Sequence, residues 1–355
     1  MPRTIDELLT RTVHLGGSDL HIAAGFVPCA RVGRILKPID SSPVSPDEAR
    51  SLVESMMDPE RFREFCQRLE AEFAHTVPGI GRFRVNCFFQ RGSAGCVCRY
   101  IPEHVPGFEE LGLPAQTLKQ ICALPRGLVL VTGPTGCGKS TTLASMIAYI
   151  NDNYTYHVMA IEDPVEYVHT NRKSIVNQRE VGIDTLNFTS ALRHVLRQNP
   201  DVILIGELRD LETISIAVTA AETGHLVFGT LHTYDAPSSV DRIVDVFPEH
   251  QQRQIRVQLA SSLQAIISQQ LIPRVGGDGV VPAVEILLAT PAVRNLIREN
   301  KAFQLYSVIQ SNMRIGMRTM NQALAELCRL GQVSVDEALT RCTDPEEFKS
   351  LVACI

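Results

Sequence analysis

A glycine-rich segment that ends in a lysine and two hydroxyl residues is the clearest candidate for chemistry. It reads Gly-Pro-Thr-Gly-Cys-Gly-Lys-Ser-Thr and lies between an apolar run at 127–132 and a helical pattern at 143–148. Glycines let backbone N–H groups surround phosphate oxygens, and a helix N-terminus adds partial positive charge. The segment predicts nucleotide binding, with Lys139 on the terminal phosphates and the Ser140 hydroxyl on Mg²⁺. The predicted phosphate-binding residues are Gly133, Pro134, Thr135, Gly136, Cys137, Gly138, Lys139, Ser140 and Thr141.

Three further apolar runs end in polar residues that could act on a bound phosphate. The first runs into Glu162, the second into Glu207, and the third ends near His232. Ligands of open α/β sheets bind outside the carboxyl ends of the strands, so we expect these side chains at the same edge as the glycine-rich loop. One carboxylate would orient a water, and Glu207 would hold Mg²⁺ through its water shell.

His225 is a weaker catalytic candidate than His232. It stands at the start of its strand, which is the wrong end for direct contact with the phosphates. A polar bridge and a structural role for this histidine fit equally well. For the two carboxylates, the alternatives are a helix cap and a surface charge.

The composition is that of a soluble globular protein. At about 150 residues per domain, the 355 residues suggest two domains, and 45% hydrophobic residues can fill two cores. The net charge of -5 argues against a dedicated nucleic-acid binder. No run reaches the roughly 18 apolar residues of a membrane span, and no secretory segment is evident. We expect a cytosolic protein whose ten cysteines, none in a Cys-x-x-Cys pair, fill the core.

The pattern of elements changes near residue 102. Before it, helical and strand-like segments alternate in an α+β arrangement. One helix is opened by Ser45 as its cap, with Pro46 at its first position and Glu48 three residues after the cap, and a hairpin has strands that cover 81–88 and 96–101. After a Pro- and Gly-rich linker, apolar β runs alternate with helices, which predicts a parallel sheet covered on both faces. The predicted division is 1–101 for the N-terminal domain, 102–113 for the linker, 114–289 for an α/β core and 290–355 for a helical tail.

Four segments resemble the motifs of one family. Residues 133–141, 162–167, 193–210 and 223–233 resemble the Walker A, Asp box, Walker B and His box of secretion ATPases, the hexameric motors of type II secretion and type IV pili. The tail resembles that of the twitching-motility retraction ATPases within this family. The residues that carry this last resemblance are Ala292, Val293, Arg294, Asn295, Leu296, Ile297, Arg298 and Glu299.

The resemblance implies a PAS-like N-terminal domain, a RecA-like ATPase core, and ATP with Mg²⁺ as ligands. It implies catalysis by Glu162, a Walker B role for Glu207, and His-box roles for His232 and His225. It also implies a homo-hexamer at the inner face of the cytoplasmic membrane that acts on the inner-membrane pilus platform protein. An accessory retraction ATPase could act beside it.

A ring ATPase benefits from arginines that neutralise phosphate charge from another domain or subunit. Arg82 and Arg84 share one face of a strand, so a solvated basic face is the alternative interpretation. Other candidates could be ion-paired structural residues. The full set of candidates is Arg82, Arg84, Arg99, Arg197, Arg209 and Arg242.

Two local features leave alternatives open. Cys137 stands where the family usually has Ser or Ala, which would allow oxidation at the loop, although a reducing cytosol disfavours this.

In the tail, Val293, Leu296 and Ile297 form an apolar stripe suited to packing, so the polar Arg294, Asn295 and Arg298 are the better functional candidates. We expect Arg294→Ala to keep much of the ATPase activity and to abolish twitching.

The sequence favours retraction over several other functions. Pilus-assembly and type II secretion ATPases usually carry an extra N-terminal domain and a tetracysteine insert, and this chain has no Cys-x-x-Cys pair. An accessory retraction ATPase is harder to exclude. A ring helicase or DNA translocase is disfavoured by the acidic balance, and a non-hydrolysing scaffold by the full set of candidate catalytic residues.

Overall fold

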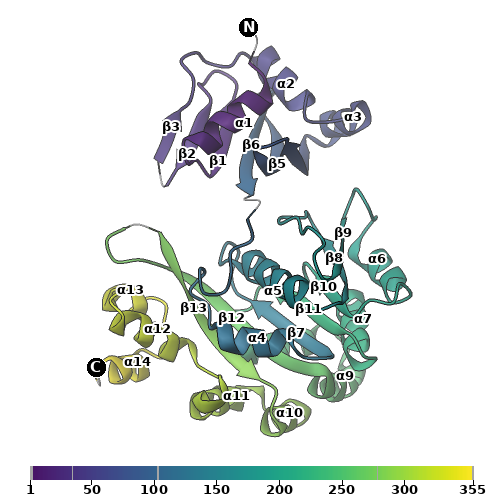
Figure 1. Cartoon of the computed structure of the whole chain (residues 1–355), viewed down its shortest axis with the longest axis vertical. Helices are drawn as coiled ribbons and strands as arrows, with labels where there is room; N and C mark the ends of the chain where they lie inside the picture. The colour runs from purple at the N-terminus through teal and green to yellow at the C-terminus, as the bar shows by residue number, and fades with distance from the viewer. Residues whose placement is uncertain (1–2, 34, 102–103, 278, 354–355) are drawn as a thin grey trace. The chain divides into compact units, whose positions relative to one another are not determined.

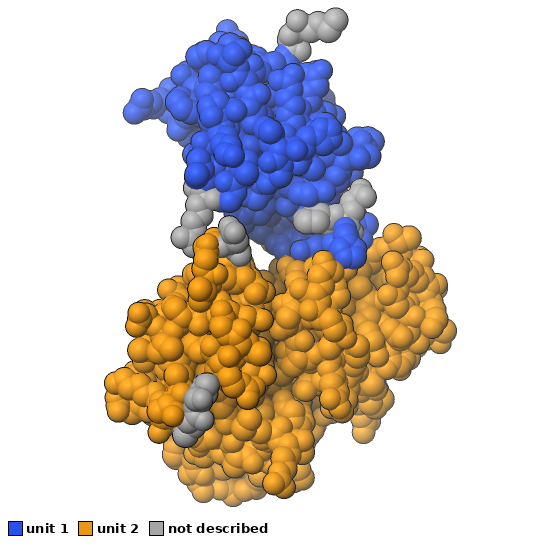
Figure 2. Space-filling model, turned by 60° about the vertical axis from the view of Figure 1, so that its left-hand side comes forward, with its two compact units in different colours: residues 1–104, 164–168 blue, residues 105–163, 169–355 orange. Residues whose placement is uncertain are grey.

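A computed structural model describes residues 3–33, 35–101, 104–277 and 279–353. The chain divides into two compact units, one of residues 1–104 with 164–168 and the other of residues 105–163 with 169–355 (Figure 2). Part of the linker predicted at 102–113, residues 102 and 103, lies outside the described residues. The sequence did not suggest that 164–168 would group with the N-terminal unit.

The N-terminal unit is an antiparallel sheet with three helices. Its strand order is β3-β2-β1-β6-β5-β4, and apolar residues of the helices join those of the strands in one core. Neighbouring strands β5 and β6 form the predicted hairpin, but β6 begins earlier than expected because the turn consists of Arg91 and Gly92 alone. The elements are α1 (Ile5–His14), β1 (Asp19–Ala23), β2 (Cys29–Val32), β3 (Ile35–Pro38), α2 (Pro46–Glu54), α3 (Pro59–Arg68), β4 (Glu70–Val77), β5 (Gly81–Gln90) and β6 (Ser93–Ile101).

The start of α2 follows the sequence pattern only in part. The Ser45 hydroxyl accepts the N–H of Glu48, and Pro46 occupies the first helical position, as expected. The Glu48 carboxylate does not return to Ser45. It accepts a hydrogen bond from the Arg3 guanidinium at 2.7 Å, because a full charge pair is a stronger partner than a backbone N–H.

The second unit is built on a seven-stranded sheet of order β13-β12-β7-β11-β10-β8-β9. All neighbouring strands are parallel except β12 and β13 (Figure 1). The strands are β7 (Gly127–Thr132), β8 (His157–Glu162), β9 (Ile175–Glu180), β10 (Val202–Ile205), β11 (Leu226–Leu231), β12 (Leu263–Pro273) and β13 (Val280–Leu288).

Helices cover both faces of this sheet, which confirms the prediction. On β7, Val129 and Val131 enter the core beneath α4 and α5, whereas Leu128 and Leu130 face the core of α6 to α10. The alternation follows from the two-residue period of a strand. The helices are α4 (Ala115–Cys122), α5 (Lys139–Asn153), α6 (Phe188–Val195), α7 (Leu211–Glu222), α8 (Ala236–Asp245), α9 (Glu249–Ser262) and α10 (Pro291–Arg298).

The end of the chain is helical, as expected, and residues 320–352 pack on Ile272 of β12 and on Val281 and Ala283 of β13. In the described part of the chain, no helix combines the length and apolarity that crossing a bilayer requires. The remaining elements are the 3₁₀ turns η1 (Ala302–Gln304) and η2 (Met313–Ile315), with α11 (Leu305–Ser311), α12 (Met320–Arg329), α13 (Val335–Leu339) and α14 (Pro345–Ala353).

Glu285 joins three elements of the second unit. It lies on β13, is 1% exposed, and accepts the N–H groups of Ala236 at 2.9 Å and Met320 at 3.4 Å. These are the first residues of α8 and α12. Burial raises the pKa of Glu285 to about 7, although both N–H groups oppose the shift.

This raised pKa predicts a pH-dependent difference between wild type and Glu285→Gln. Folding stability from this carboxyl is fully present below its ordinary pKa and is lost as pH rises through about 7. Glutamine keeps an acceptor for the helix N–H groups but cannot ionise. In scanning calorimetry, the variant's unfolding temperature relative to wild type should therefore be higher at pH 8 than at pH 5.5. An equal difference at both values would contradict the placement of an ionisable Glu285 between the two helices.

Candidate functional site

The glycine-rich loop connects β7 to α5 as the sequence predicts. Helix α5 begins at Lys139, and its N-cap is Gly138, which has no side chain and adopts φ 89°. The Lys139 ammonium donates to the carbonyls of Gly133 at 2.8 Å and Pro134 at 3.1 Å, so it lies across the loop. Ser140 is exposed at the first turn of the helix. This arrangement can bind phosphate through the helix N-terminus and the lysine.

Cys137 is packed inside the loop and does not face solvent. It is 3% exposed, and its sulfur lies against Gly133, where an added Cβ would come within 2.6 Å. Burial raises the pKa of the Cys137 thiol above its ordinary value. Because the thiolate is the reactive form, this cysteine acts as a small filler of the loop.

Parallel pairing brings the predicted catalytic residues to the edge that carries this loop. Thr132 at the end of β7 pairs with Leu231 of β11, and Ile205 of β10 pairs with both Gly229 and Ile161. The next residues along these strands are Gly133, His232, Gly206 and Glu162. Additional hydrogen bonds continue the alignment past the strand ends, from Gly206 N–H to Ile161 at 2.8 Å and from Leu208 N–H to Thr230 at 3.0 Å.

Glu207 is the centre of a charged cluster at this edge. One oxygen of its carboxylate lies 2.7 Å from the Arg209 guanidinium and 3.2 Å from His232 Nε2. Partial burial alone would raise the pKa of Glu207, but Arg209 and His232 outweigh it and leave that pKa below its ordinary value. Glu207 is therefore an ionised carboxylate at neutral pH, which suits a Mg²⁺ ion held with the Ser140 hydroxyl, since hard cations prefer oxygen ligands.

Glu162 ends β8 and is held from the neighbouring strand β9. Its carboxylate accepts a hydrogen bond from the Gln178 amide at 3.0 Å, and its backbone pairs with Glu180. Asp163 follows it and contributes to raising the pKa of Arg209. The segments that follow β8 and β10 therefore interact electrostatically at this edge.

His225 is not brought to the same edge. It precedes the first residue of β11, and its Nδ1 lies 3.0 Å from the Ala220 carbonyl, while its own carbonyl accepts the N–H of Gly127 at 2.9 Å. These contacts are at the amino ends of the strands, opposite the loop. Within one chain, His225 bridges α7 and β7.

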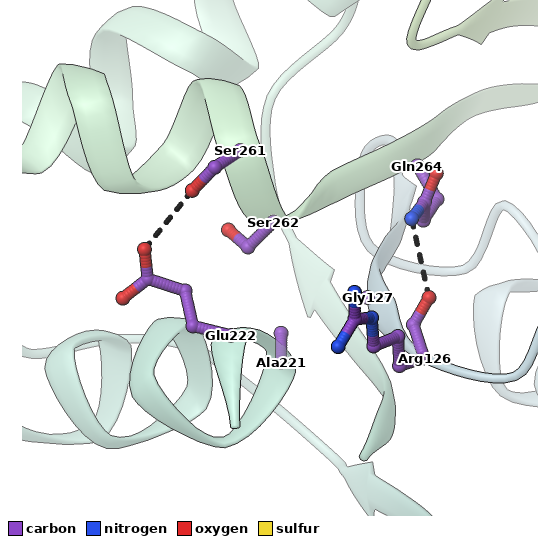
Figure 3. A pocket seen from close by; sticks show the side chains of 7 residues that line it. All are labelled: Arg126, Gly127, Ala221, Glu222, Ser261, Ser262 and Gln264. Carbon is purple, nitrogen blue, oxygen red and sulfur yellow. Dashed lines mark hydrogen bonds between the residues drawn. The ribbon is translucent and has the colours of Figure 1, made fainter. Parts of the chain in front are cut away.

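A polar pocket of about 190 Å³ lies at that opposite edge. In it, the Glu222 carboxylate accepts the Ser261 hydroxyl at 2.9 Å, and the Gln264 amide donates to the Arg126 carbonyl at 3.2 Å (Figure 3). The pocket is lined by Arg126, Gly127, Ala221, Glu222, Ser261, Ser262 and Gln264.

The candidate arginines of the N-terminal unit are engaged in contacts within that unit. Arg82 Nε donates to the Val165 carbonyl at 3.1 Å. Arg84 bonds the carboxylates of Glu72 and, at 3.0 Å, Glu166, so β5 is tied to the segment at 164–168. Arg99 pairs with the buried Asp19 at 2.9 Å. In the second unit, Arg197 and Arg242 are exposed, and Arg209 belongs to the Glu207 cluster.

Arg294 of the tail is half-buried and contacts its own chain. Its guanidinium donates to the carbonyls of Ala260 at 2.6 Å and Ser261 at 2.8 Å and to the Gln264 side chain at 3.1 Å. It thus caps the end of α9 and reaches the start of β12. By contrast, Asn295 and Arg298 lie on the exposed face of α10, and Val293 and Ile297 are buried.

Sequence reasoning missed three residues that hold the site. Gln269 and Thr142 are buried polar residues beneath the glycine-rich loop, and Gln178 supports Glu162. The available signal was the pair Ser268 and Gln269, which are polar residues inside the apolar run that forms β12. Polar side chains in a buried strand require hydrogen-bond partners.

The contacts of Arg294 change what its removal should do. Arg294→Ala leaves the carbonyls at the end of α9 without their donor, so we expect the free energy of unfolding to fall by about 1–2 kcal/mol in urea denaturation. The matched variant Arg298→Ala removes an exposed side chain and should stay within about 0.5 kcal/mol of wild type. Equal stability of the two variants would show that Arg294 does not cap α9. A twitching defect of Arg294→Ala could come from this lost stability alone. It therefore has to be compared with Arg298→Ala before it is assigned to lost coupling between ATP hydrolysis and retraction.

Comparisons with known proteins identify the family of this chain. The family model described as type II/IV secretion system protein matches residues 82–279. The type IV pilus retraction ATPase PilT of Pseudomonas aeruginosa is 49% identical over 97% of this chain and 99% of its own. The type IV pilus ATPase PilU of the same organism is 42% identical over 98% of this chain and 91% of its own. The crystal structure of the pilus retraction motor PilT with bound ADP superposes with a TM-score of 0.91 at 47% identity, covering 98% of this chain and 99% of that one. The chain therefore belongs to the type II/IV secretion system protein family and, within it, to the ATPases whose close members retract type IV pili.

Proposed function

We propose that the protein is an ATP-hydrolysing motor that powers type IV pilus retraction and thereby twitching motility. The observation that carries the proposal is the 49% identity to a pilus retraction ATPase along 97% of this chain. It is supported by Lys139 of the glycine-rich loop and by Glu162, Glu207 and His232, which follow the strands at the same sheet edge. The proposed reaction is hydrolysis of ATP to ADP and phosphate, coupled to mechanical work.

The residues at the sheet edge that carries the glycine-rich loop suit transfer of the γ-phosphoryl group of ATP to water. Phosphoryl transfer depends on positioning and on neutralising charge. The N–H groups of the loop and Lys139 would hold the phosphates, Glu162 would orient the attacking water, and His232 would contact the γ-phosphate while bonded to Glu207. Mg²⁺, when held near Ser140 and Glu207, would neutralise phosphate charge. Arg209 and His232 lower the pKa of Glu207 against the effect of burial, which favours the ionised carboxylate.

The proposed assembly is a homo-hexamer at the inner face of the cytoplasmic membrane. It would act on the inner-membrane platform protein of the pilus, with or without an accessory retraction ATPase. We propose that Asn295 and Arg298, which are exposed on α10, carry the coupling role of the tail motif, with Arg294 fixing the helix. Among the six candidate arginines, the exposed Arg197 and Arg242 are the ones we propose to approach nucleotide in a neighbouring copy.

Two alternatives within the family are less well supported. An accessory motor would be expected to resemble PilU more than PilT, and the identity is higher to PilT, at 49% against 42%. Pilus-assembly and type II secretion ATPases remain the next alternative. A ring helicase or DNA translocase would require ATPase activity that DNA stimulates.

Substitutions at the loop edge should separate binding from turnover. Lys139→Ala removes the cation that contacts the phosphates, so ATP hydrolysis should fall to background in a phosphate-release assay. Glu207→Gln keeps the shape of the side chain but removes its charge, and we expect it to retain ADP binding while losing about 100-fold or more in kcat. Near-normal kcat in both folded variants would refute the assignment of this site.

Deletion of the gene tests retraction against assembly. Cells without the protein should carry abundant pili in electron micrographs and should fail to twitch, because pili extend but do not return. Complementation with wild type should restore twitching, and complementation with Lys139→Ala should not. Absence of pili in the deletion strain would instead assign the protein to pilus assembly.

A further inference from the structure

A buried glutamine of strand β12, Gln269, is hydrogen-bonded to the glycine-rich loop. Gln269 is 3% exposed. Its Nε2 donates to the Cys137 carbonyl at 2.7 Å, and its Oε1 accepts the Thr142 hydroxyl at 2.8 Å. One neutral amide thus binds the last turn of the loop and the first turns of α5 at the same time. Its partners are more than 120 residues away in the sequence.

The loop backbone is pressed against this glutamine. A Cβ added to Gly133 would meet the Gln269 carbonyl oxygen at 2.3 Å, and one added to Gly138 would meet its Nε2 at 2.9 Å. Both glycines also have positive φ values, 141° and 89°, which side chains rarely adopt. The neighbouring Thr132 and Ser268 hydroxyls bond each other at 2.9 Å. The fit between loop and strand is therefore close on both sides of Gln269.

The bond to Cys137 fixes the direction of one peptide group. In a trans peptide, the C=O and the following N–H point in opposite directions. Because Gln269 holds the Cys137 carbonyl toward β12, the N–H of Gly138 points away from β12. Gly138 is a residue that tolerates many conformations, so without this bond the peptide group could rotate at little cost.

We propose that Gln269 is a positioning residue of the ATP site, which holds the Cys137–Gly138 peptide with its N–H toward the phosphates. The inference rests on the proposed ATPase function. Phosphate binding by backbone N–H groups depends on their orientation before the ligand arrives. Gln269 supplies a donor and an acceptor in one uncharged group, so it orients the loop without placing a negative charge beneath the phosphates.

The test compares Gln269→Leu with Gln270→Leu. Leucine at 269 fills a similar volume but makes neither hydrogen bond, whereas Gln270, the next residue of β12, has no part in the loop contacts described above. With ADP as the probe in titration calorimetry, we expect Gln269→Leu to bind about 10-fold more weakly than wild type. In steady-state assays the KM for ATP should rise about 10-fold with kcat within about 3-fold, because the lost interaction affects substrate and transition state alike. Gln270→Leu should match wild type.

A second pair of variants tests the proposal independently, in case Gln269→Leu does not fold. Thr142→Val removes the hydroxyl that donates a hydrogen bond to Gln269 Oε1, whereas Thr142→Ser keeps a hydroxyl at this position. We expect weaker ADP binding for the valine variant and near-normal binding for the serine variant. If ADP affinity and KM stay within 2-fold of wild type in folded Gln269→Leu and in Thr142→Val, the positioning role is wrong. A wild-type protein that neither binds ADP nor hydrolyses ATP would contradict the proposed function itself.

Discussion

Parallel pairing of β7, β11, β10 and β8 is the constraint on which the site depends. Their carboxyl ends coincide to within two residues, so residues more than 60 positions apart in the sequence leave the sheet at one edge. A slip of one residue would turn each side chain to the opposite face. Burial of both sheet faces by apolar side chains prevents such a slip. The proposed ATP site is therefore a consequence of core packing as much as of its own polar contacts.

Polar side chains at both edges of the sheet connect its strands to the helices of the second unit. Gln269 of β12 holds the glycine-rich loop. Glu285 of β13 holds the start of α8, which begins four residues after His232, and the start of α12 in the tail. Arg294 ties α10 to the end of α9 and to Gln264. Contiguous contacts of this kind are one route by which a change at a bound nucleotide can move distant helices.

The sequence predicted the elements with local signals and missed those that depend on distant partners. Strand β7, the helix begun by Lys139 and the polar ends of the strands follow from apolar runs, glycine spacing and the rule for sheet edges. The inward direction of Arg294 was not predictable, because helical spacing does not show that the end of α9 lies beside it. The grouping of 164–168 with the N-terminal unit and the contacts of Gln269 depend likewise on residues far apart in the chain. The departure of Glu48 from its expected cap has the same cause, since its partner Arg3 is 45 residues away.

The most direct measurement of the central claim is time-lapse fluorescence of labelled pili in cells whose chromosomal copy carries Glu207→Gln. Each pilus is followed through extension and retraction, and a strain with the wild-type gene serves as the reference. If the ionised carboxylate at the sheet edge is required for the hydrolysis that drives retraction, pili should extend at the normal rate and then remain extended. Retraction at the wild-type speed and frequency in this strain would contradict the account.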